Sequence, residues 1–411
     1  MNQSVTTSSE SSYITTHADL ERLCHQLQAS AELALDTEFV GEESFVPKLE
    51  LIQVASPGVS AVIDFPAVQA DGPLDVFWEL ICNPRVNKIV HAGRQDLDLF
   101  AVHAGQIPKP FFDTQIAAAM LGFGAQAAYA NLVQRIIGTR LAKAHTFTNW
   151  SARPLSHDQI AYAAEDVQFL LPIHAHLVRK LSTLGRLDWA HEEFARLESV
   201  VGEKSRDPLE RYQRIRGWEG LKPKYAAVLR DLAAWRESEA KRRNVPRGRV
   251  LRDEVLLQLA RHPPRTLNEL KTLRGVHSSE IERNGEHILK TVERSLALPP
   301  AAWPQVPTEK RPEPESIGVV ELLQAVLKAR AAEAEIAPTL LATSADIQAL
   351  VEAKEKKNEI ALPLLRGWRR DVAGNLMLQV LNGDVTVRVS RSGTLLFKQD
   401  GAGVMGKGYS S

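Results

Sequence analysis

Short apolar runs alternate with helical segments over the first half of the chain, and this alternation restricts the fold more than any other feature. Four runs have the length and composition of strands, at residues 32–39, 49–55, 59–64 and 86–91. Helical segments are expected at residues 73–82, 94–103, from Asp113 onward, 129–137 and 156–184. Ser156 is a candidate N-cap and Pro172 a candidate kink of the last segment. Strands first, with helices interleaved later, predict an α/β domain with a mixed sheet.

From about residue 206 the pattern is helical only. The expected helices are residues 208–215, 222–242, 252–261, 266–272 and 278–296. Residues 299–315 contain six prolines, a composition typical of a semi-extended linker. A second helical unit is expected over residues 317–380, followed by a hairpin around Ser392 and Gly393.

These patterns divide the chain into six parts. We expect a flexible tail at 1–12, an α/β domain at 13–200, a helical domain at 206–290, a Pro-rich linker at 297–316, a second helical domain with its hairpin at 317–398, and a flexible tail at 399–411. The sequence has no run of 18 apolar residues and no apolar core near Met1, so neither a membrane span nor a signal peptide is expected. Two distant cysteines, Cys24 and Cys82, exclude a disulfide framework and favour a reduced, cytoplasmic setting.

The net charge of zero conceals an acidic region and a basic region of the chain. Residues 1–200 carry 14 Lys+Arg against 23 Asp+Glu, and residues 201–300 carry 22 against 14. An acidic region followed by a basic one fits a protein that holds metal with the first and nucleic-acid phosphates with the second. Ordinary solvated surface charge is the alternative interpretation.

Four carboxylates and one tyrosine form the candidate site. Asp36 and Glu38 end the first strand, where period-2 geometry places both on one face. Asp96 lies one turn into the helix after the strand VNKIVH, and Tyr162 and Asp166 share a helix face at i,i+4 spacing. Carboxylates that gather in this way can hold two Mg²⁺ or Mn²⁺ ions for an in-line displacement at phosphorus. Taken singly, each residue is equally compatible with a strand end, a solvated first-turn acid or an ordinary helix surface.

Three motifs carry a family resemblance. LDTEF, HAGRQDLDLF and HDQIAYAAEDVQFLLPI resemble the motifs of the DEDD superfamily of 3′–5′ exonucleases, in the subgroup with a tyrosine at the position of Tyr162. A longer match over about residues 30–185 is to the ribonuclease D family. The resemblance implies an RNase H-like mixed sheet, Asp36, Glu38, Asp96 and Asp166 as ligands of two divalent ions, and Tyr162 as the residue that positions the attacking water. It also implies trimming of tRNA precursors and other small structured RNAs to nucleoside 5′-monophosphates.

One segment departs from the family. The loop after DTEF reads Gly41-Glu42-Glu43-Ser44-Phe45, where the family often has a basic residue and a Thr-Tyr pair. The resemblance therefore does not extend to RNA contacts by this loop.

The helical region carries a second resemblance. The segment GWEGLKPKYAAVLRDLAAWRESEAKRRNVPRGRV within residues 206–290 resembles the HRDC domain, a small nucleic-acid-binding module, and residues 317–380 look like a diverged copy. A basic cluster lies around the loop that contains Pro246 and comprises Lys241, Arg242, Arg243, Arg247 and Arg249. A solvated face is one interpretation of it, and the nuclease motifs on the same chain favour phosphate contacts. Arg94 and Trp150 are further candidates for RNA contact, with a solvated arginine and a packing tryptophan as the alternatives. His91 is expected to have a core or capping role.

The expected function is therefore that of a metal-dependent exoribonuclease acting on RNA as a monomer. A 3′–5′ exonuclease acting on DNA is an alternative, because the carboxylate chemistry does not choose the sugar. A non-catalytic RNA-binding protein that kept the fold is the other.

Overall fold

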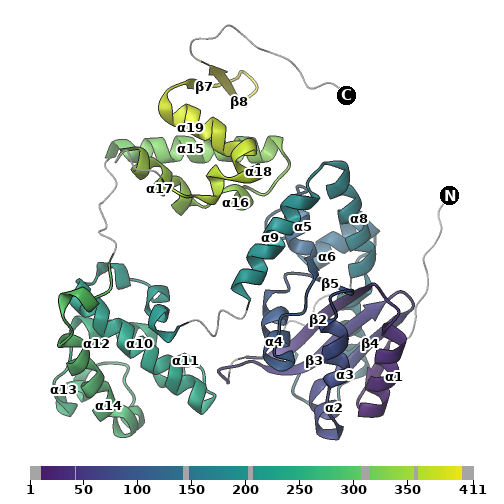
Figure 1. Ribbon diagram of the computed structural model, residues 1–411, viewed down its shortest axis with the longest axis horizontal. Coiled ribbons are helices and arrows are strands. Elements are labelled where there is room, and N and C mark those ends of the chain that lie inside the picture. The colour runs from purple at the N-terminus through teal and green to yellow at the C-terminus, as the bar shows by residue number, and fades with distance from the viewer. Residues whose placement is uncertain are drawn as a thin grey trace.

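The computed structural model describes residues 11–41, 43–141, 148–201, 207–306, 314–355 and 360–399. These residues form an α/β domain, a helical module and a C-terminal unit that is mostly helical (Figure 1). The expected tails fall almost entirely outside the described residues, although the first strand begins as early as Ser12. None of the described helices is long and apolar enough to cross a membrane.

The α/β domain is built on a mixed sheet, as the sequence predicts, but the sheet has six strands and includes two, β1 and β6, that were not expected. The strand order is β1-β4-β3-β2-β5-β6. The strands span Ser12–Ile14 (β1), Glu32–Val40 (β2), Lys48–Ser56 (β3), Val59–Asp64 (β4), Asn87–Val90 (β5) and Phe111–Asp113 (β6). Strand β3 pairs antiparallel with β2 and β4, whereas the pairs β1–β4, β2–β5 and β5–β6 are parallel.

Helices cover both faces of this sheet. They span His17–Leu27 (α1), Phe65–Asp71 (α2), Asp75–Cys82 (α3), Arg94–Ala104 (α4), Thr114–Ala119 (α5), Tyr129–Leu132 (α6), His157–Gln168 (α7), Leu170–Thr183 (α8) and Leu187–Val200 (α9), with a π-turn at Val133–Ile137 after α6. Along β2, Leu33 and Leu35 pack with α1 and α3, whereas Ala34 packs with the cluster that contains α8. Because side chains alternate along a strand, Asp36 and Glu38 lie on the same face as Ala34.

The helical module follows the expected pattern. Its elements are the 3₁₀ turns Pro208–Arg214 and Trp218–Gly220 and the helices Pro223–Arg243 (α10), Arg247–Val250 (α11), Asp253–Arg261 (α12), Leu267–Thr272 (α13) and Ser278–Leu296 (α14). Trp218, Leu221, Leu229 and Leu232 are buried in its core. The segment expected as a helix at 208–215 is a 3₁₀ turn.

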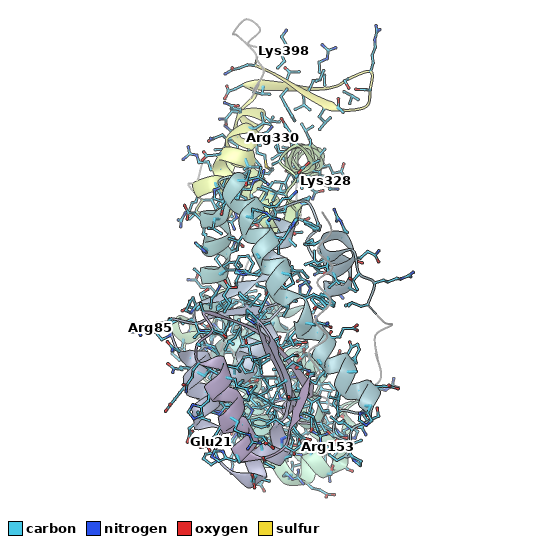
Figure 2. The ribbon with its side chains drawn as sticks, turned by 90° about the vertical axis from the view of Figure 1, so that its right-hand side faces the viewer. Glu21, Arg85, Arg153, Lys328, Arg330 and Lys398 are labelled. Atoms are coloured by element: carbon cyan, nitrogen blue, oxygen red, sulfur yellow. The ribbon has the colours of Figure 1, made fainter. Side chains whose placement is uncertain are left out.

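The C-terminal unit begins inside the expected linker. Its helices span Pro314–Glu333 (α15), Pro338–Leu341 (α16), Ser344–Glu355 (α17), Gly367–Arg369 (α18) and Asn375–Asn382 (α19), and the hairpin pairs Val385–Val389 (β7) with Leu395–Gln399 (β8). Residues 307–313 of the linker lie outside the described part of the chain. In Figure 2, Lys328, Arg330 and Lys398 mark this unit at one end of the molecule, and Glu21 and Arg153 lie at the other.

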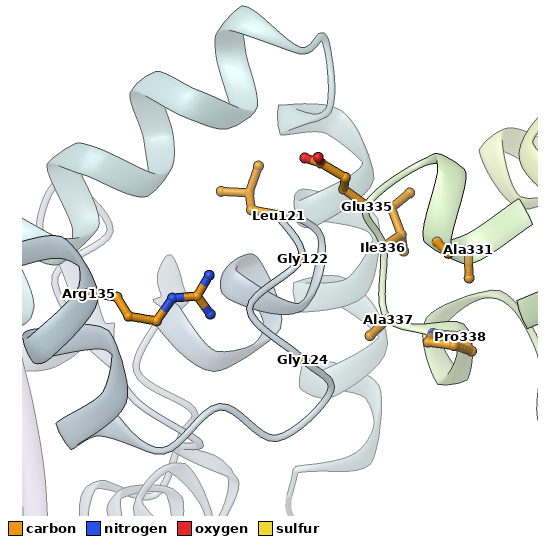
Figure 3. Close-up of a pocket in the computed structure, with 10 residues that line it drawn as sticks. Leu121, Gly122, Gly124, Arg135, Ala331, Glu335, Ile336, Ala337 and Pro338 are labelled. Carbon is orange, nitrogen blue, oxygen red and sulfur yellow. The ribbon is translucent and has the colours of Figure 1, made fainter. Parts of the chain in front are cut away.

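The C-terminal unit packs directly on the α/β domain. Trp189 of α9 stacks on Trp368 at a centroid distance of 4.9 Å, and the amide of Ala337 donates to the carbonyl of Ala119 at 2.8 Å. The guanidinium of Arg369 is buried between Glu192 and Glu193 of α9. A pocket of about 400 Å³ lies along this interface between the loop 121–124 and the turn at Glu335 (Figure 3). Arg135 and Glu335 line it together with apolar side chains and glycines, so it is separate from the candidate carboxylates.

The helical module contacts the α/β domain through the loop that follows Glu38. Phe45 is only 8% exposed and packs against Ala240 and Val250 of the module. The guanidinium of Arg247 lies 4.5 Å above the Phe45 ring and is bound by Glu237 through two hydrogen bonds. The loop therefore anchors the module to the strand that carries Asp36 and Glu38.

Candidate active site

Strand β2 presents the first two carboxylates. Asp36 pairs with Gln53 and Glu38 with Leu51 in the antiparallel ladder, and the register shifts immediately after Glu38. The shift skips Glu50 of β3, because Phe39 pairs with Leu49. The two acids thus end the regular part of the strand and face helix α7, which packs across β2, β3 and β4.

Asp96 is held by the sharp turn between β5 and α4. Asp113 at the end of β6 accepts hydrogen bonds from the amides of Ala92 (3.2 Å) and Gly93 (3.0 Å). A Cβ atom at Gly93 would lie 2.5 Å from Val90 Cγ2, so only glycine fits there. Asp96 lies in the first turn of α4, is 7% exposed, and accepts a short hydrogen bond from the Thr37 hydroxyl of β2.

Helix α7 carries Tyr162 and Asp166 on one face. Ser156 accepts from the amide of Gln159 and the Gln159 side chain accepts from the amide of Ser156, a capping box that fixes where the helix starts. The Tyr162 ring stacks on Trp150, with centroids 6.2 Å apart and an interplanar angle of 26°. Asp64 and Glu50 bind Arg153 in the same segment and tie it to β3 and β4.

The electrostatics show that the acids lie close together. Burial, followed by repulsion from Asp96, Asp166 and Glu38, raises the pKa of Asp36 well above its usual value. Burial, followed by repulsion from Asp166 and Asp96, raises the pKa of Glu38 to about 8.

The other two acids are shifted in the same direction. Burial raises the pKa of Asp96 to about 6, against the opposing hydrogen bond from Thr37. Burial, with repulsion from Glu165, raises the pKa of Asp166 to about 7. Within the described ranges, no lysine or arginine forms an ion pair with any of the four acids.

This combination fits a site for hard divalent cations. Buried like charges that lack a basic partner are stabilised when a cation sits among them. Carboxylate oxygens are also the ligands that Mg²⁺ and Mn²⁺ prefer. Among the described side chains, no three possible ligands already converge with the spacing of a bound ion. One oxygen of Asp96 accepts the hydrogen bond from Thr37.

The remaining candidates of the α/β domain have structural partners. His91 has the core role expected of it, because its Nδ1 lies 2.9 Å from the Thr114 hydroxyl and its ring packs on Tyr129. Arg94 begins α4 and reaches the carbonyl of Val200 at 3.5 Å. Trp150 is 7% exposed and packs on Tyr162, so the packing alternative describes it better than base stacking.

Three of the five residues in the basic cluster are engaged by carboxylates. Arg242 binds Glu239 at 2.7 Å, Arg243 binds Glu280 at 2.9 Å, and Arg247 binds Glu237 at 2.5 Å. Lys241 and Arg249 are exposed, and no ion pair joins either of them to another described residue. The sequence did not show that acids from α10 and α14 compensate three of the five cations.

A groove of 760 Å³ beside this cluster was not expected. Arg243, Arg249, Arg252, Arg283 and His277 line it together with Glu280 of the module and Glu43 of the α/β domain. Arg252 and Arg283 are exposed and lie on or next to different helices, α12 and α14. Four arginines against two glutamates give the groove a positive balance.

Comparison with known proteins identifies the family to which the chain is similar. A sequence profile described as 3′–5′ exonuclease matches residues 12–182, and one described as HRDC domain matches residues 226–292. Curated proteins named ribonuclease D are similar over nearly the whole chain. The protein from Granulibacter bethesdensis is 38% identical over 92% of this chain and 94% of its own length, and that from Gluconacetobacter diazotrophicus is 40% identical over the same two shares.

A solved structure extends the similarity to three dimensions. The crystal structure of Escherichia coli RNase D, described as an exoribonuclease involved in structured RNA processing, superposes with a TM-score of 0.80 at 30% identity. The match covers 91% of this chain and 99% of that one, so it includes the sheet and both helical regions. With its mixed sheet, its acidic site and its HRDC module, the chain belongs to the ribonuclease D family of 3′–5′ exoribonucleases.

Proposed function

We propose that this exoribonuclease removes nucleoside 5′-monophosphates from the 3′ ends of tRNA precursors and other small structured RNAs, with two divalent ions at the site. Asp36, Glu38, Asp96 and Asp166 would hold the ions, with Mg²⁺ as the usual metal and Mn²⁺ as a substitute. The observation that carries the proposal is that four acids from β2, α4 and α7, Asp96 buried and the other three partly buried, gather without a basic partner and have raised pKa values. When bound, such ions activate a water and stabilise the departing 3′ oxygen.

The protein side chains position the reactants around that chemistry. Burial and the neighbouring acids raise the pKa of Tyr162 to about 12, so its hydroxyl keeps its proton at neutral pH. It therefore acts by orienting the attacking water through a hydrogen bond. Trp150, packed on its ring, restricts where that hydroxyl lies.

The positive groove of the helical module is the proposed contact for the RNA backbone. Arginines form strong hydrogen bonds with phosphates, and Arg249, Arg252 and Arg283 lie together in this groove. Lys241 adds charge nearby. Arg242, Arg243 and Arg247, which are bound by glutamates, contribute less to this surface.

Salt dependence tests the groove. Each phosphate contact to a single strand adds roughly 0.7 to the slope of log affinity against log salt concentration. Replacing Arg249, Arg252 and Arg283 by alanine should therefore reduce the slope by about 2. Arg85→Ala on the α/β domain is the control. An unchanged slope in the triple variant would remove the groove from the RNA path.

Product analysis tests the activity. A precursor tRNA with a short 3′ trailer and a DNA of matched sequence are incubated with Mg²⁺, and the released products are identified. Nucleoside 5′-monophosphates released stepwise from the RNA, and lost in EDTA, are the expected result. Preferential digestion of the DNA would support the alternative of a DNA exonuclease, and binding without digestion would support a non-catalytic RNA-binding protein.

The molecule is proposed to act as a monomer in the cytoplasm, where tRNA precursors are found. The compact docking of the C-terminal unit on α9 within one chain supports the monomer. Light scattering during gel filtration tests it, and a mass twice that of 411 residues would contradict it.

A further inference from the structure

Helices α7 and α8 form one helical path that is interrupted at Phe169. In an unbroken α-helix, the amide of residue 169 would donate to the carbonyl of residue 165. Here the hydroxyl of Tyr129 takes the place of that bond. It accepts a hydrogen bond from the amide of Phe169 at 3.0 Å and donates to the carbonyl of Glu165 at 3.0 Å.

Pro172 alone does not account for this interruption. Proline lacks an amide hydrogen and crowds the carbonyl four residues earlier, so Pro172 removes the bond to Gln168. The bond between the amide of residue 169 and the carbonyl of residue 165 would lie three residues earlier in the helix. Neither residue is a proline, so both groups are able to form it. Side-chain insertion into the helix ladder is a recognised cause of a break, and the inserted group here comes from α6, about 40 residues earlier in the chain.

The inserted tyrosine is held firmly and lies beside the acids. Its ring packs on His91 with centroids 5.8 Å apart, and His91 is tied to Thr114, whose hydroxyl also donates to the carbonyl of Val90. Burial raises the pKa of Tyr129 above its usual value, as do the nearby charges of Asp166 and Asp36. The hydroxyl therefore keeps its proton and acts as a hydrogen-bond donor next to the proposed metal site.

We propose that Tyr129 is a positioning residue that sets the direction of Asp166. The carbonyl to which its hydroxyl donates belongs to Glu165, the residue immediately before Asp166. The insertion separates the backbone groups of residues 165 and 169 and opens the last turn of α7 there. This opening fixes where the Asp166 carboxylate points relative to Asp36. The inference rests on the proposed two-ion site and adds a residue that touches neither ion nor RNA.

Tyr129→Phe tests the role of the hydroxyl because it keeps the ring. Without the hydroxyl, the Phe169 amide and the Glu165 carbonyl can bond directly, so no buried polar group is stranded and the variant remains folded. The loss of the hydrogen bonds made by the hydroxyl should lower the Tm by about 2–4 °C. The helix then closes and Asp166 turns away from its partners.

The expected result is a weaker metal site with unchanged RNA binding. The Mn²⁺ affinity, measured without RNA by electron paramagnetic resonance of the free ion, should fall about 10–100-fold, as for other residues that orient metal ligands. RNA affinity in EDTA should equal that of the wild type. Turnover should fall at low Mn²⁺ and recover in part at high Mn²⁺, which a purely structural loss of stability would not produce.

Two controls separate the possible failures. Tyr212→Phe removes a buried tyrosine hydroxyl in the helical module and should leave the Mn²⁺ affinity unchanged. Tyr129→Leu, which also lacks the hydroxyl, should reproduce the loss if the hydroxyl and not the ring is responsible. If the wild type itself binds no Mn²⁺, the proposed two-ion function is wrong. If the wild type binds Mn²⁺ and both folded variants bind it equally well, only the inference about Tyr129 is wrong.

Discussion

Asp36 lies among three other carboxylates, and its ionisation in the absence of a cation opposes folding. Glu38, Asp96 and Asp166 share this property, because burial raises the pKa of each. The residues proposed for catalysis thus destabilise the folded state of the metal-free protein. Such a conflict between stability and activity is common at functional sites.

Asp36→Asn should separate these two effects. Turnover should fall by at least about 100-fold, because an ion ligand is lost, while RNA affinity in EDTA stays close to that of the wild type. In EDTA at pH 8 the Tm should rise by a few degrees, at about 2–4 °C per kcal/mol of relieved repulsion. Calorimetry and single-turnover assays measure both. Asp188→Asn, an exposed acid on α9, is the control and should change neither; wild-type turnover in Asp36→Asn would remove Asp36 from the site.

The stabilising effect of Mn²⁺ should increase with pH. The pKa values of Asp96, Asp166 and Glu38 in the folded chain are raised to about 6, 7 and 8. Groups with raised pKa values favour the fold when protonated, so that contribution is complete below pH 4 and is lost as the pH rises toward 8. Mn²⁺ binds the ionised forms and restores stability there.

The quantity to measure is the difference in Tm with and without Mn²⁺, since other titrating groups cancel in it. It should be small at pH 5.5 and larger at pH 8, and activity should increase over the same range. An equal difference at both pH values would contradict the assignment of the shifted acids to the metal site. Asp36→Asn should show a reduced dependence on pH.

At the scale of secondary structure, the elements of the site were predictable and their junctions were not. The apolar run before Asp36 predicted β2, and Ser156 as a candidate N-cap predicted the start of α7, because these signals are local in sequence. The break after α7 was expected at Pro172 but lies at Phe169, where Tyr129 inserts. That insertion depends on tertiary packing, which local patterns do not contain.

The same reason explains the other missed contacts. Thr37 and Asp113 orient Asp96, yet each resembles an ordinary strand or turn residue in the sequence. Phe45 reads as an apolar residue in a loop, and its partners Ala240 and Val250 lie about 200 positions later. The signal that could have revealed Phe45 is a large aromatic in a loop that otherwise carries acidic and small residues.

Phe45→Ala should loosen the helical module from the α/β domain. Removing a buried phenylalanine costs roughly 3–5 kcal/mol in a core, and Arg247 would also lose its aromatic partner. Hydrolysis of a trinucleotide should remain near the wild-type rate, because Phe45 is not among the proposed catalytic residues. Trimming of a precursor tRNA should slow, because the groove is no longer held beside the site.

Small-angle scattering checks the structural part of this prediction. The radius of gyration of Phe45→Ala should increase, whereas Val102→Ala, an exposed apolar control on α4, should leave it unchanged. Equal slowing on both substrates would mean that the loop acts on catalysis and not on docking.

At the scale of the whole molecule, two docking contacts hold three parts together. The helical module is held through Phe45 and Arg247, and the C-terminal unit through Trp189, Trp368 and Arg369. The sequence predicted the three parts and the acidic and basic halves. It could not predict this arrangement, because each contact joins residues at least 175 positions apart.

Arg369→Met should destabilise the docked C-terminal unit. The side chain is 1% exposed, and its removal leaves the buried Glu193 with only the half-exposed Arg196, at 3.4 Å, as a cationic partner. Removing one partner of a buried ion pair typically costs 3–5 kcal/mol. Urea unfolding monitored by tryptophan fluorescence should show an early transition as the stacked indoles separate. Glu192→Gln is the control, because that partner is half exposed and its loss should cost less than about 1 kcal/mol.

The stacking of Trp368 on α9 also bears on how this enzyme can be shortened. A chain that stops at residue 306 keeps every proposed catalytic group. It would, however, expose the indole of Trp189 and the apolar surface around it to water. Exposed patches of this kind promote self-association. Minimal versions of the nuclease would therefore precipitate or pair with one another, unless polar substitutions on α9 replace the cover that the last hundred residues provide.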